Sequence, residues 1–152
     1  MNEQEMPQMQ LLLRDEQVRD EIIFLTPTHY QEAIEWIRRH FTFAYGQQID
    51  WSHDANAVTG NMQDLRENAL LQLLRQYDVE PTQTLTVIWA YADIGVKLPF
   101  SLIARHIHAI WLPIVDDVFV LDTHDTWCLE IFHEGNFSCG MYEKMKIARE
   151  NL

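Results

Sequence analysis

Residues 116–135 hold the densest group of chemically active side chains in this chain. Their sequence is DDVFVLDTHDTWCLEIFHEG, in which six carboxylates and two histidines surround two apolar runs. Carboxylate oxygens and imidazole nitrogens bind divalent metal ions, and carboxylate pairs act as acid and base in glycoside hydrolysis. An acidic surface also suits a basic protein partner. The stretch therefore raises three alternatives: a metal site, a catalytic carboxylate pair and a protein-binding surface.

The metal alternative has its best ligand set in Asp122, His124 and Asp125, with His133 and Glu134 a strand away. Aspartate is common in turns, however, because its side chain accepts hydrogen bonds from nearby backbone amides. The sequence contains no HExxH motif, EF-hand loop or CxxC pair. We therefore predict no bound metal and no other cofactor.

The catalytic alternative rests on incomplete patterns. Cys128 and His133 lie on one expected strand at a spacing that sends their side chains to opposite faces. Phe132 stands two residues after Glu130, where a nuclease would be expected to carry a lysine. The separation of a glycosidase carboxylate pair depends on the fold and cannot be read from spacing. We expect no catalytic residue, with a small metal-assisted hydrolase as the alternative from another class.

Charge narrows the possible partners. Eleven Lys and Arg against 23 Asp and Glu give a net charge of −12, which repels nucleic acid because that binding depends on cationic side chains. No run approaches the roughly 18 apolar residues that cross a bilayer, and MNEQEMPQMQ lacks the regions of a signal peptide. We predict a cytoplasmic protein that binds neither nucleic acid nor membrane. In that compartment Cys128 and Cys139 are expected to be free thiols, with a disulfide as the alternative.

The elements that position residues 116–135 come in two groups. The chain, residues 1–152, is expected to form one domain, with residues 1–10 flexible. A short strand is expected at 21–26, followed by helices near 28–44 and 62–77. Thr28 with Gln31 matches a capping box for the first helix, and Asn61 caps the second. Residues 47–60 are expected to form an irregular loop.

From residue 84 the sequence becomes rich in β-branched and aromatic residues. Strands are expected at 84–91, 116–122, 126–134 and 136–142, and a helical turn at 143–152. A short helix from Pro99 to about Ile107 is expected to lead into a strand near 109–112. The fold class is therefore α+β, with N-terminal helices packed on a mostly antiparallel C-terminal sheet.

The turn at 123–126 sets the register of the hairpin. It places Val120 opposite Leu129, Val118 opposite Ile131, and Asp116 opposite His133. Because side chains alternate across a strand, the four apolar residues of the first two pairs share the core face. The opposite face is expected to be half covered by a helix or open to a partner, and it carries Asp117, Phe119, Leu121, Cys128, Glu130 and Phe132.

The stretch IWLPIVDDVFVLDTHDTWCLEIFHEGN, residues 110–136, resembles small immunity proteins that protect bacteria from polymorphic toxins, including those of contact-dependent inhibition systems. The shared features are an apolar strand, a DD pair, a second strand, a turn and the pattern W-x-L-E-I-x-H-E-G. The resemblance implies an acidic cytosolic protein without enzymatic activity, which neutralises a cognate toxin, often a nuclease, by stoichiometric binding. A phage- or plasmid-borne acidic inhibitor of a host defence enzyme is the alternative among binding proteins.

A nuclease toxin carries a basic cleft, so an acidic protein can cover that cleft and associate rapidly with it. We expect the hairpin to supply an apolar anchor inside a charged rim. The predicted partner-binding residues are Asp117, Asp122, Asp125, Trp127, Glu130, Phe132 and Glu134. The alternative role for the carboxylates is a solvated edge that keeps strands from pairing with other chains.

Overall fold

The computed structural model describes residues 3–44, 48–112 and 116–143. Within them the helices are η1 (Glu3–Glu5), α1 (Pro7–Leu12), α2 (Glu16–Glu21), α3 (Pro27–His40), η2 (Trp51–His53), α4 (Glu67–Arg75), α5 (Phe100–Arg105) and α6 (Ile107–Ile110). The strands are β1 (Ile23–Phe24), β2 (Val58–Asn61), β3 (Thr84–Trp89), β4 (Ile94–Pro99), β5 (Val118–Leu121), β6 (Trp127–Ile131) and β7 (Asn136–Met141). The expected helical turn at 143–152 lies almost wholly outside the described residues.

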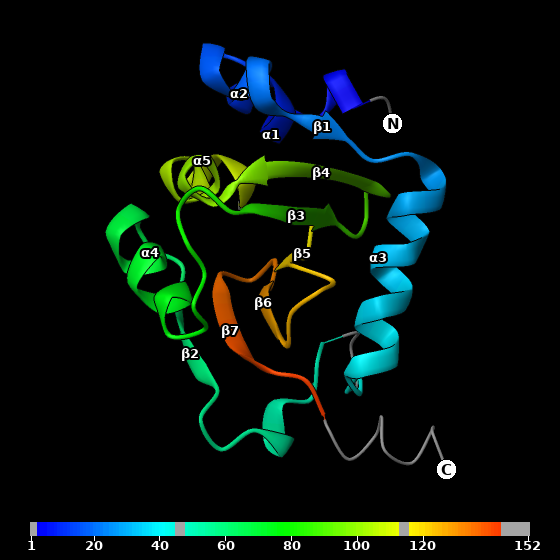
Figure 1. Cartoon of the computed structure of the whole chain (residues 1–152), viewed down its shortest axis with the longest axis vertical. Coiled ribbons are helices and arrows are strands. Elements are labelled where there is room, and N and C mark those ends of the chain that lie inside the picture. The colour runs from blue at the N-terminus through cyan, green and yellow to red at the C-terminus, as the bar shows by residue number, and fades with distance from the viewer. Residues whose placement is uncertain (1–2, 45–47, 113–115, 144–152) are drawn as a thin grey trace.

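The strands form one seven-stranded sheet in the order β1-β4-β3-β5-β6-β7-β2. Each neighbouring pair is antiparallel. Figure 1 shows α3 on one side of this sheet and α4 and α5 on the other. The fold is α+β, as the sequence predicts. No helix among the described residues has the length and apolar character needed to cross a bilayer.

The hairpin of β5 and β6 has the predicted register. Val118 pairs with Ile131 and Val120 with Leu129, and all four side chains belong to the larger core under α1, α4, α5 and α6. Phe119 lies on the opposite face in a second core, to which α3 contributes Tyr30, Ala33 and Ile37. The second face is thus covered by a helix, one of the two predicted possibilities.

The N-terminus differs from the prediction. Residues 3–10 are not a flexible tail, because Met6 and Met9 are at most 2% exposed and pack, with Leu12, into the larger core. Gln8, between the two methionines, is also buried, at 8% exposed. Helix α3 begins at Pro27 and is capped by Thr26, whose hydroxyl accepts the His29 amide, and not by the predicted Thr28.

Four further elements depart from the prediction. Strand β4 follows β3 through a tight turn, and β2 begins within the segment 47–60 that was expected to be an irregular loop. Residues 107–110 form the one-turn helix α6, so the strand expected near 109–112 is wrong. Helix α4 begins after Arg66, because Asn61 accepts the amide of Gln63 in a local turn and does not cap it.

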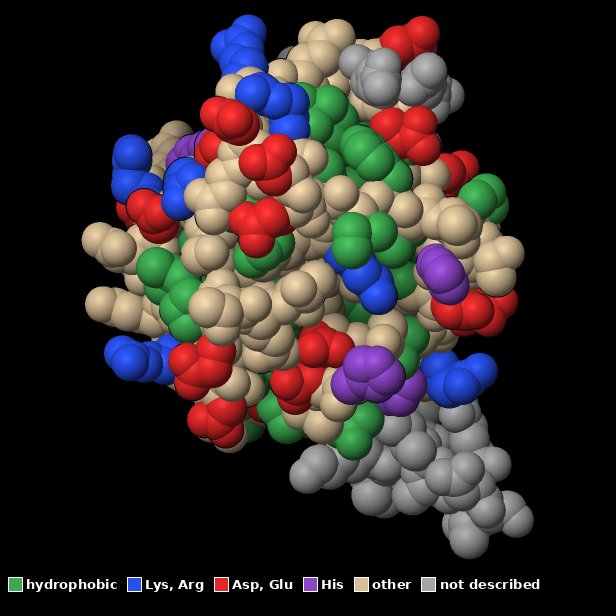
Figure 2. Space-filling model, turned by 45° about the horizontal axis from the view of Figure 1, so that its top comes forward, with side chains coloured by type: hydrophobic (Ala, Val, Ile, Leu, Met, Phe, Trp, Pro, Cys, Tyr) green, Lys and Arg blue, Asp and Glu red, His purple; other side chains and the backbone are tan. Residues whose placement is uncertain are grey.

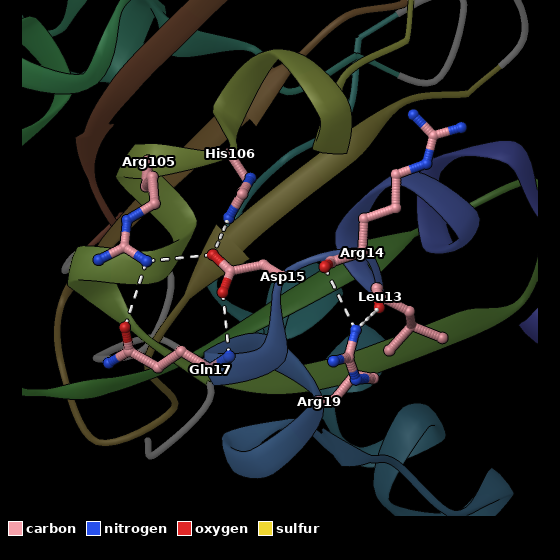
Figure 3. Close-up of polar contacts among 7 residues, drawn as sticks. All are labelled: Leu13, Arg14, Asp15, Gln17, Arg19, Arg105 and His106. Atoms are coloured by element: carbon pink, nitrogen blue, oxygen red, sulfur yellow. Dashed lines mark hydrogen bonds and ion pairs between the residues drawn. The ribbon is translucent and has the colours of Figure 1, made fainter.

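Asp15 ties the N-terminal helices to the segment between α5 and α6 (Figure 3). Its Oδ2 accepts hydrogen bonds from His106 Nε2 at 2.7 Å and Arg105 at 3.1 Å, and its Oδ1 accepts the Gln17 amide at 2.9 Å. The bond from His106 is the main cause that lowers the pKa of Asp15 to about 2. Arg19 donates to the carbonyls of Leu13 and Arg14 and so satisfies acceptors at the end of α1.

The two outermost strands are short, with two residues in β1 and four in β2. Where β2 no longer pairs with β7, side chains of the loop before β2 form hydrogen bonds with the main chain at the end of β7. Asp54 Oδ2 accepts the amide of Met141 at 2.8 Å, and His53 Nε2 donates to the Met141 carbonyl at 2.8 Å.

Both cysteines are buried and free. Cys128 lies in the core under α3, and Cys139 lies in the larger core on the opposite face of the sheet. Their side chains therefore point apart, and a disulfide between them requires rearrangement of the sheet.

Candidate partner-binding surface

The structure divides the predicted partner-binding residues among three places. Trp127 and Glu130 are buried within the sheet. Asp122 and Asp125 lie in the turn between β5 and β6. At the other end of the same hairpin lie Asp117, Phe132 and Glu134. The hairpin therefore does not present one continuous rim.

Trp127 belongs to the core. Its side chain is 0% exposed, and its ring lies 6.3 Å from that of Tyr77 in a stacked arrangement. The expectation that it is an exposed anchor is wrong, because the face of β6 that carries it is covered by α4 and the loop after it.

Glu130 is 5% exposed and holds a loop onto the sheet. Its carboxylate accepts the Ile49 amide at 2.8 Å and the Trp51 indole N–H at 3.1 Å. Burial raises the pKa of Glu130 to about 7, although these two hydrogen bonds oppose the shift. Glu130 is thus shielded from a partner by residues 48–51, which the sequence suggested were an irregular polar loop.

Asp122 and Asp125 stabilise the turn between β5 and β6. Asp122 accepts the amide of His124 and the side-chain amide of Gln83, both at 2.9 Å. Asp125 accepts the Thr126 amide at 2.8 Å. Both aspartates are half-buried. Their hydrogen bonds to nearby backbone amides are those that make aspartate common in turns.

The opposite end of the sheet carries the most exposed aromatic side chain of the described residues. Tyr91 is 75% exposed and lies in the turn of residues 90–93, between β3 and β4. The buried carboxylate of Asp116 accepts the amides of Tyr91 at 2.6 Å and Ala92 at 3.2 Å. Asp93 has a φ of 54° and accepts the hydroxyl of Tyr30 at 3.2 Å. The turn is therefore fixed from both sides.

Asp117 connects this turn to the end of β6. Its backbone carbonyl accepts the Ala90 amide at 3.1 Å, and its Oδ1 accepts the amide and ring Nδ1 of His133 at 2.9 and 3.0 Å. His133 was predicted to lie opposite Asp116. It contacts Asp117 because regular pairing stops at Ile131 and the chain turns at Phe132.

We call this region the Tyr91 surface and define it as Tyr91, Asp93, Phe132, His133 and Glu134. Phe132 is half-buried and its ring centroid lies 4.2 Å from that of His133, while Glu134 is exposed. Of the predicted residues, this surface contains Phe132 and Glu134, whereas Asp117 lies beneath it, buried at 9% exposed and bonded to His133. Sequence reasoning missed Tyr91 and Asp93; the available signal was the run IGVKLP directly after WAYAD, which is typical of a second hairpin strand.

Negative charge is concentrated behind the Tyr91 surface. Burial raises the pKa of Asp116 to about 6, and the neighbouring charge of Asp117 adds to that increase. The two carboxylates therefore repel one another, and a cation bound nearby relieves that repulsion.

The metal ligands considered from the sequence are separated. Asp122, His124 and Asp125 lie at one end of the hairpin, and His133 and Glu134 at the other. In the part of the chain that the structure describes, no three His, Cys, Asp or Glu side chains lie close enough together to hold a metal ion. The other pair considered is also divided, because Cys128 is fully buried whereas His133 is half-buried at the surface.

On the face shown in Figure 2, Asp and Glu side chains are spread among Lys, Arg and apolar side chains and do not merge into one patch. Total charge alone therefore does not locate an interface. Comparison with known proteins gives no further indication, because no protein-family model and no curated protein matches this chain.

Proposed function

We propose that this protein is an immunity- or antitoxin-type inhibitor that binds a basic toxin domain, such as a nuclease, in a one-to-one complex through the Tyr91 surface. The observation that carries the proposal is the exposed ring of Tyr91, on a turn that Asp116 fixes, with the exposed Asp93 in the same turn and the exposed Glu134 after β6 at the same end of the sheet. In this role the protein acts in the bacterial cytoplasm, without a cofactor, nucleic acid or membrane.

A rigid exposed tyrosine suits a binding anchor. Tyrosine is enriched among the residues that contribute most to protein interfaces. Because Asp116 and Tyr30 hold the turn in place, little conformational entropy is lost when Tyr91 is buried by a partner. The surrounding carboxylates then match a basic cleft in sign.

The net charge of −12 supports rapid capture of such a partner. Electrostatic attraction raises association rates, and salt screens it. An inhibitor that protects the cell producing the toxin benefits from a fast encounter. An acidic inhibitor of a host defence enzyme would use the same chemistry, so the identity of the partner must decide between the two.

The decisive experiment measures binding to the toxin domain encoded beside this gene, at low and at high salt. Tyr91→Ala is expected to weaken binding at least tenfold, mostly through faster dissociation. Asp93→Asn and Glu134→Lys are expected to slow association and to reduce its salt dependence. Asn is chosen at position 93 because it tolerates the positive φ.

Glu80→Lys is the matched control. Glu80 is exposed and lies beyond the opposite end of β3. Its replacement by lysine changes the net charge by the same amount as Glu134→Lys. Its association rate is expected to change much less. If Asp122→Lys and Asp125→Lys impair binding while Tyr91→Ala does not, the interface lies at the other end of the hairpin. If the wild-type protein binds no neighbouring toxin domain, the immunity function is wrong.

A further inference from the structure

Residues 48–54, which we call the strap, lie directly on β6 and β7. The side chain of Ile49 is 4% exposed and packs into the second core. The ring of Trp51 lies against Gly140 of β7, where a Cβ atom would come within 2.9 Å of it. A glycine at this position therefore lets the strap approach the main chain of the sheet closely.

Glu130 lies beneath the strap, and both of its hydrogen bonds come from it. The donors are the amide of Ile49 at 2.8 Å and the indole N–H of Trp51 at 3.1 Å. Closure of the strap therefore removes the carboxyl group from water and returns two hydrogen bonds. Burial outweighs those bonds, because it raises the pKa of Glu130 to about 7.

The charges around Glu130 add to the cost of ionising it. The titratable and charged groups on the surrounding elements are Asp117 before β5, Cys128 of β6, Asp50, His53 and Asp54 of the strap, Arg38 and His40 of α3, and Glu143 after β7. Among these, the negative charge of Asp117 raises the pKa of Glu130 further. Arg38 is exposed, so water screens its field.

We propose that the strap is a pH-sensitive cover, which is held most firmly when Glu130 is protonated and opens more often once Glu130 is ionised. Opening returns the carboxylate to water and releases its two donors. It also uncovers the buried ring of Phe41, whose centroid lies 5.4 Å from that of Trp51. This inference does not rest on the proposed function, because it concerns the chain by itself.

The direction of the effect follows from the two states of Glu130. Its pKa is about 7 under the closed strap, against the ordinary value of 4.5 for a carboxyl group in water. As pH rises from 4.5 to 7, the open state gives up its proton before the closed state does, so closure weakens. Above pH 7 both states are ionised and the effect levels off. Between pH 5.5 and 8 the opening constant is expected to rise about 25-fold.

Amide hydrogen exchange between pH 5.5 and 8, corrected for the intrinsic exchange rate, measures the opening. The amides of Ile49 and Asp50 donate to Glu130 and to the Thr42 carbonyl, and opening breaks both bonds. Their protection is expected to fall at least tenfold over this range. The amides of Val87 and Val120, in the central strands, are expected to be at least tenfold better protected at every pH.

Two results of this measurement would overturn the proposal. Equal protection of the strap amides and the central-strand amides would show that the whole domain opens and that the strap does not move by itself. Constant protection of Ile49 across the pH range would show that ionisation of Glu130 is not coupled to the strap.

Three variants separate coupling from simple loosening. Glu130→Gln keeps an acceptor and removes the charge, so the protection of Ile49 is expected to fall less than threefold. Glu134→Gln, at an exposed position, is the control and should keep the wild-type fall. Trp51→Phe removes a donor that favours the ionised form, so its fall is expected to be at least twofold larger. A variant that only loosens the strap lowers protection equally at every pH, and that outcome for Trp51→Phe would contradict the proposal.

His53 is the other group of the strap that titrates near neutral pH. Its two ring nitrogens face the carbonyls of Asp50 at 3.0 Å and Met141 at 2.8 Å, and only the imidazolium form donates to both. Glu143 lies 3.5 Å from Nδ1. In His53→Gln the protection of Ile49 is expected to keep a fall of at least tenfold. Loss of the fall in His53→Gln, with a wild-type fall in Glu130→Gln, would assign the pH dependence to His53 and overturn the role of Glu130.

Discussion

The carboxylate of Glu130 accepts the indole N–H of Trp51 at 3.1 Å, across 79 residues of sequence. The same carboxylate accepts the amide of Ile49 at 2.8 Å, so one side chain of a central strand fixes a loop from the first half of the chain. This relationship stabilises the cover over the second core. It also places an ionisable group where its charge is poorly solvated.

Stability is expected to rise as pH falls from about 8 to about 5. The folded pKa of Glu130 is about 7 against an ordinary value of 4.5, and that of Asp116 is about 6 against 3.8. Between these values the folded state binds protons that the unfolded state lacks, so lowering the pH favours folding. Each group contributes a slope of at most ~1.4 kcal/mol per pH unit.

Glu130→Gln tests the assignment to Glu130. Glutamine keeps an acceptor oxygen and removes the charge, so the variant is expected to show a flatter dependence of unfolding free energy on pH in urea titrations. Glu134→Gln, at an exposed position, is the control and should retain the wild-type slope. A wild-type slope in Glu130→Gln would show that this carboxyl group does not titrate in the window.

Gly140→Ala is expected to destabilise the protein by about 1–3 kcal/mol, the usual cost of overpacking. A Cβ atom at this position would lie 2.7 Å from Asp54 Oδ2 and 2.9 Å from the Trp51 ring. Chemical denaturation measures the effect, with Ser138→Ala in the same strand as a control that adds no volume. Equal stability of Gly140→Ala and wild type would mean that the loop carrying Trp51 moves away at little cost.

Asp116→Ala is expected to destabilise the protein by about 1–3 kcal/mol, because two amides lose a buried acceptor. Amide hydrogen exchange at Tyr91 and Ala92 should accelerate. Asp116→Asn should retain most of the stability at neutral pH, since it keeps an acceptor and removes a charge whose pKa is raised to about 6. The same loss in both variants would contradict an acceptor role for this side chain.

Both thiols are expected to resist a thiol reagent in the folded protein. Burial raises the pKa of Cys139 to about 12 and that of Cys128 well above its ordinary value, and only the thiolate reacts. Titration at pH 8 should detect almost no thiol before denaturation and two afterwards. A mass two units lower after mild oxidation would reveal the disulfide that the opposite faces of the sheet argue against.

The strengths and failures of sequence reasoning have physical causes here. Alternation of apolar residues located the hairpin and its register, because one face of each strand must be buried. Alternation does not reveal what covers the other face. The cover consists of α3 and the loop held by Glu130, and both depend on contacts between residues far apart in sequence.

The missed elements are those with weak local patterns. Strand β4 contains Gly95 and ends at Pro99, and β2 has only four residues, including Gly60. Such strands form because a neighbouring strand pairs with them, and not from their own propensity. Tyr91 was missed for the same reason, since its exposure follows from the turn that β4 creates.

The shortness of the two outer strands restricts how this protein can associate with others. A partner that extends a sheet needs a row of unpaired main-chain groups, and the outer strands offer only two residues in β1 and four in β2. Strand addition and amyloid-like growth therefore have little template here. We expect the molecule to recognise a partner through the shape and charge of its side chains, and not by addition of a strand to its sheet.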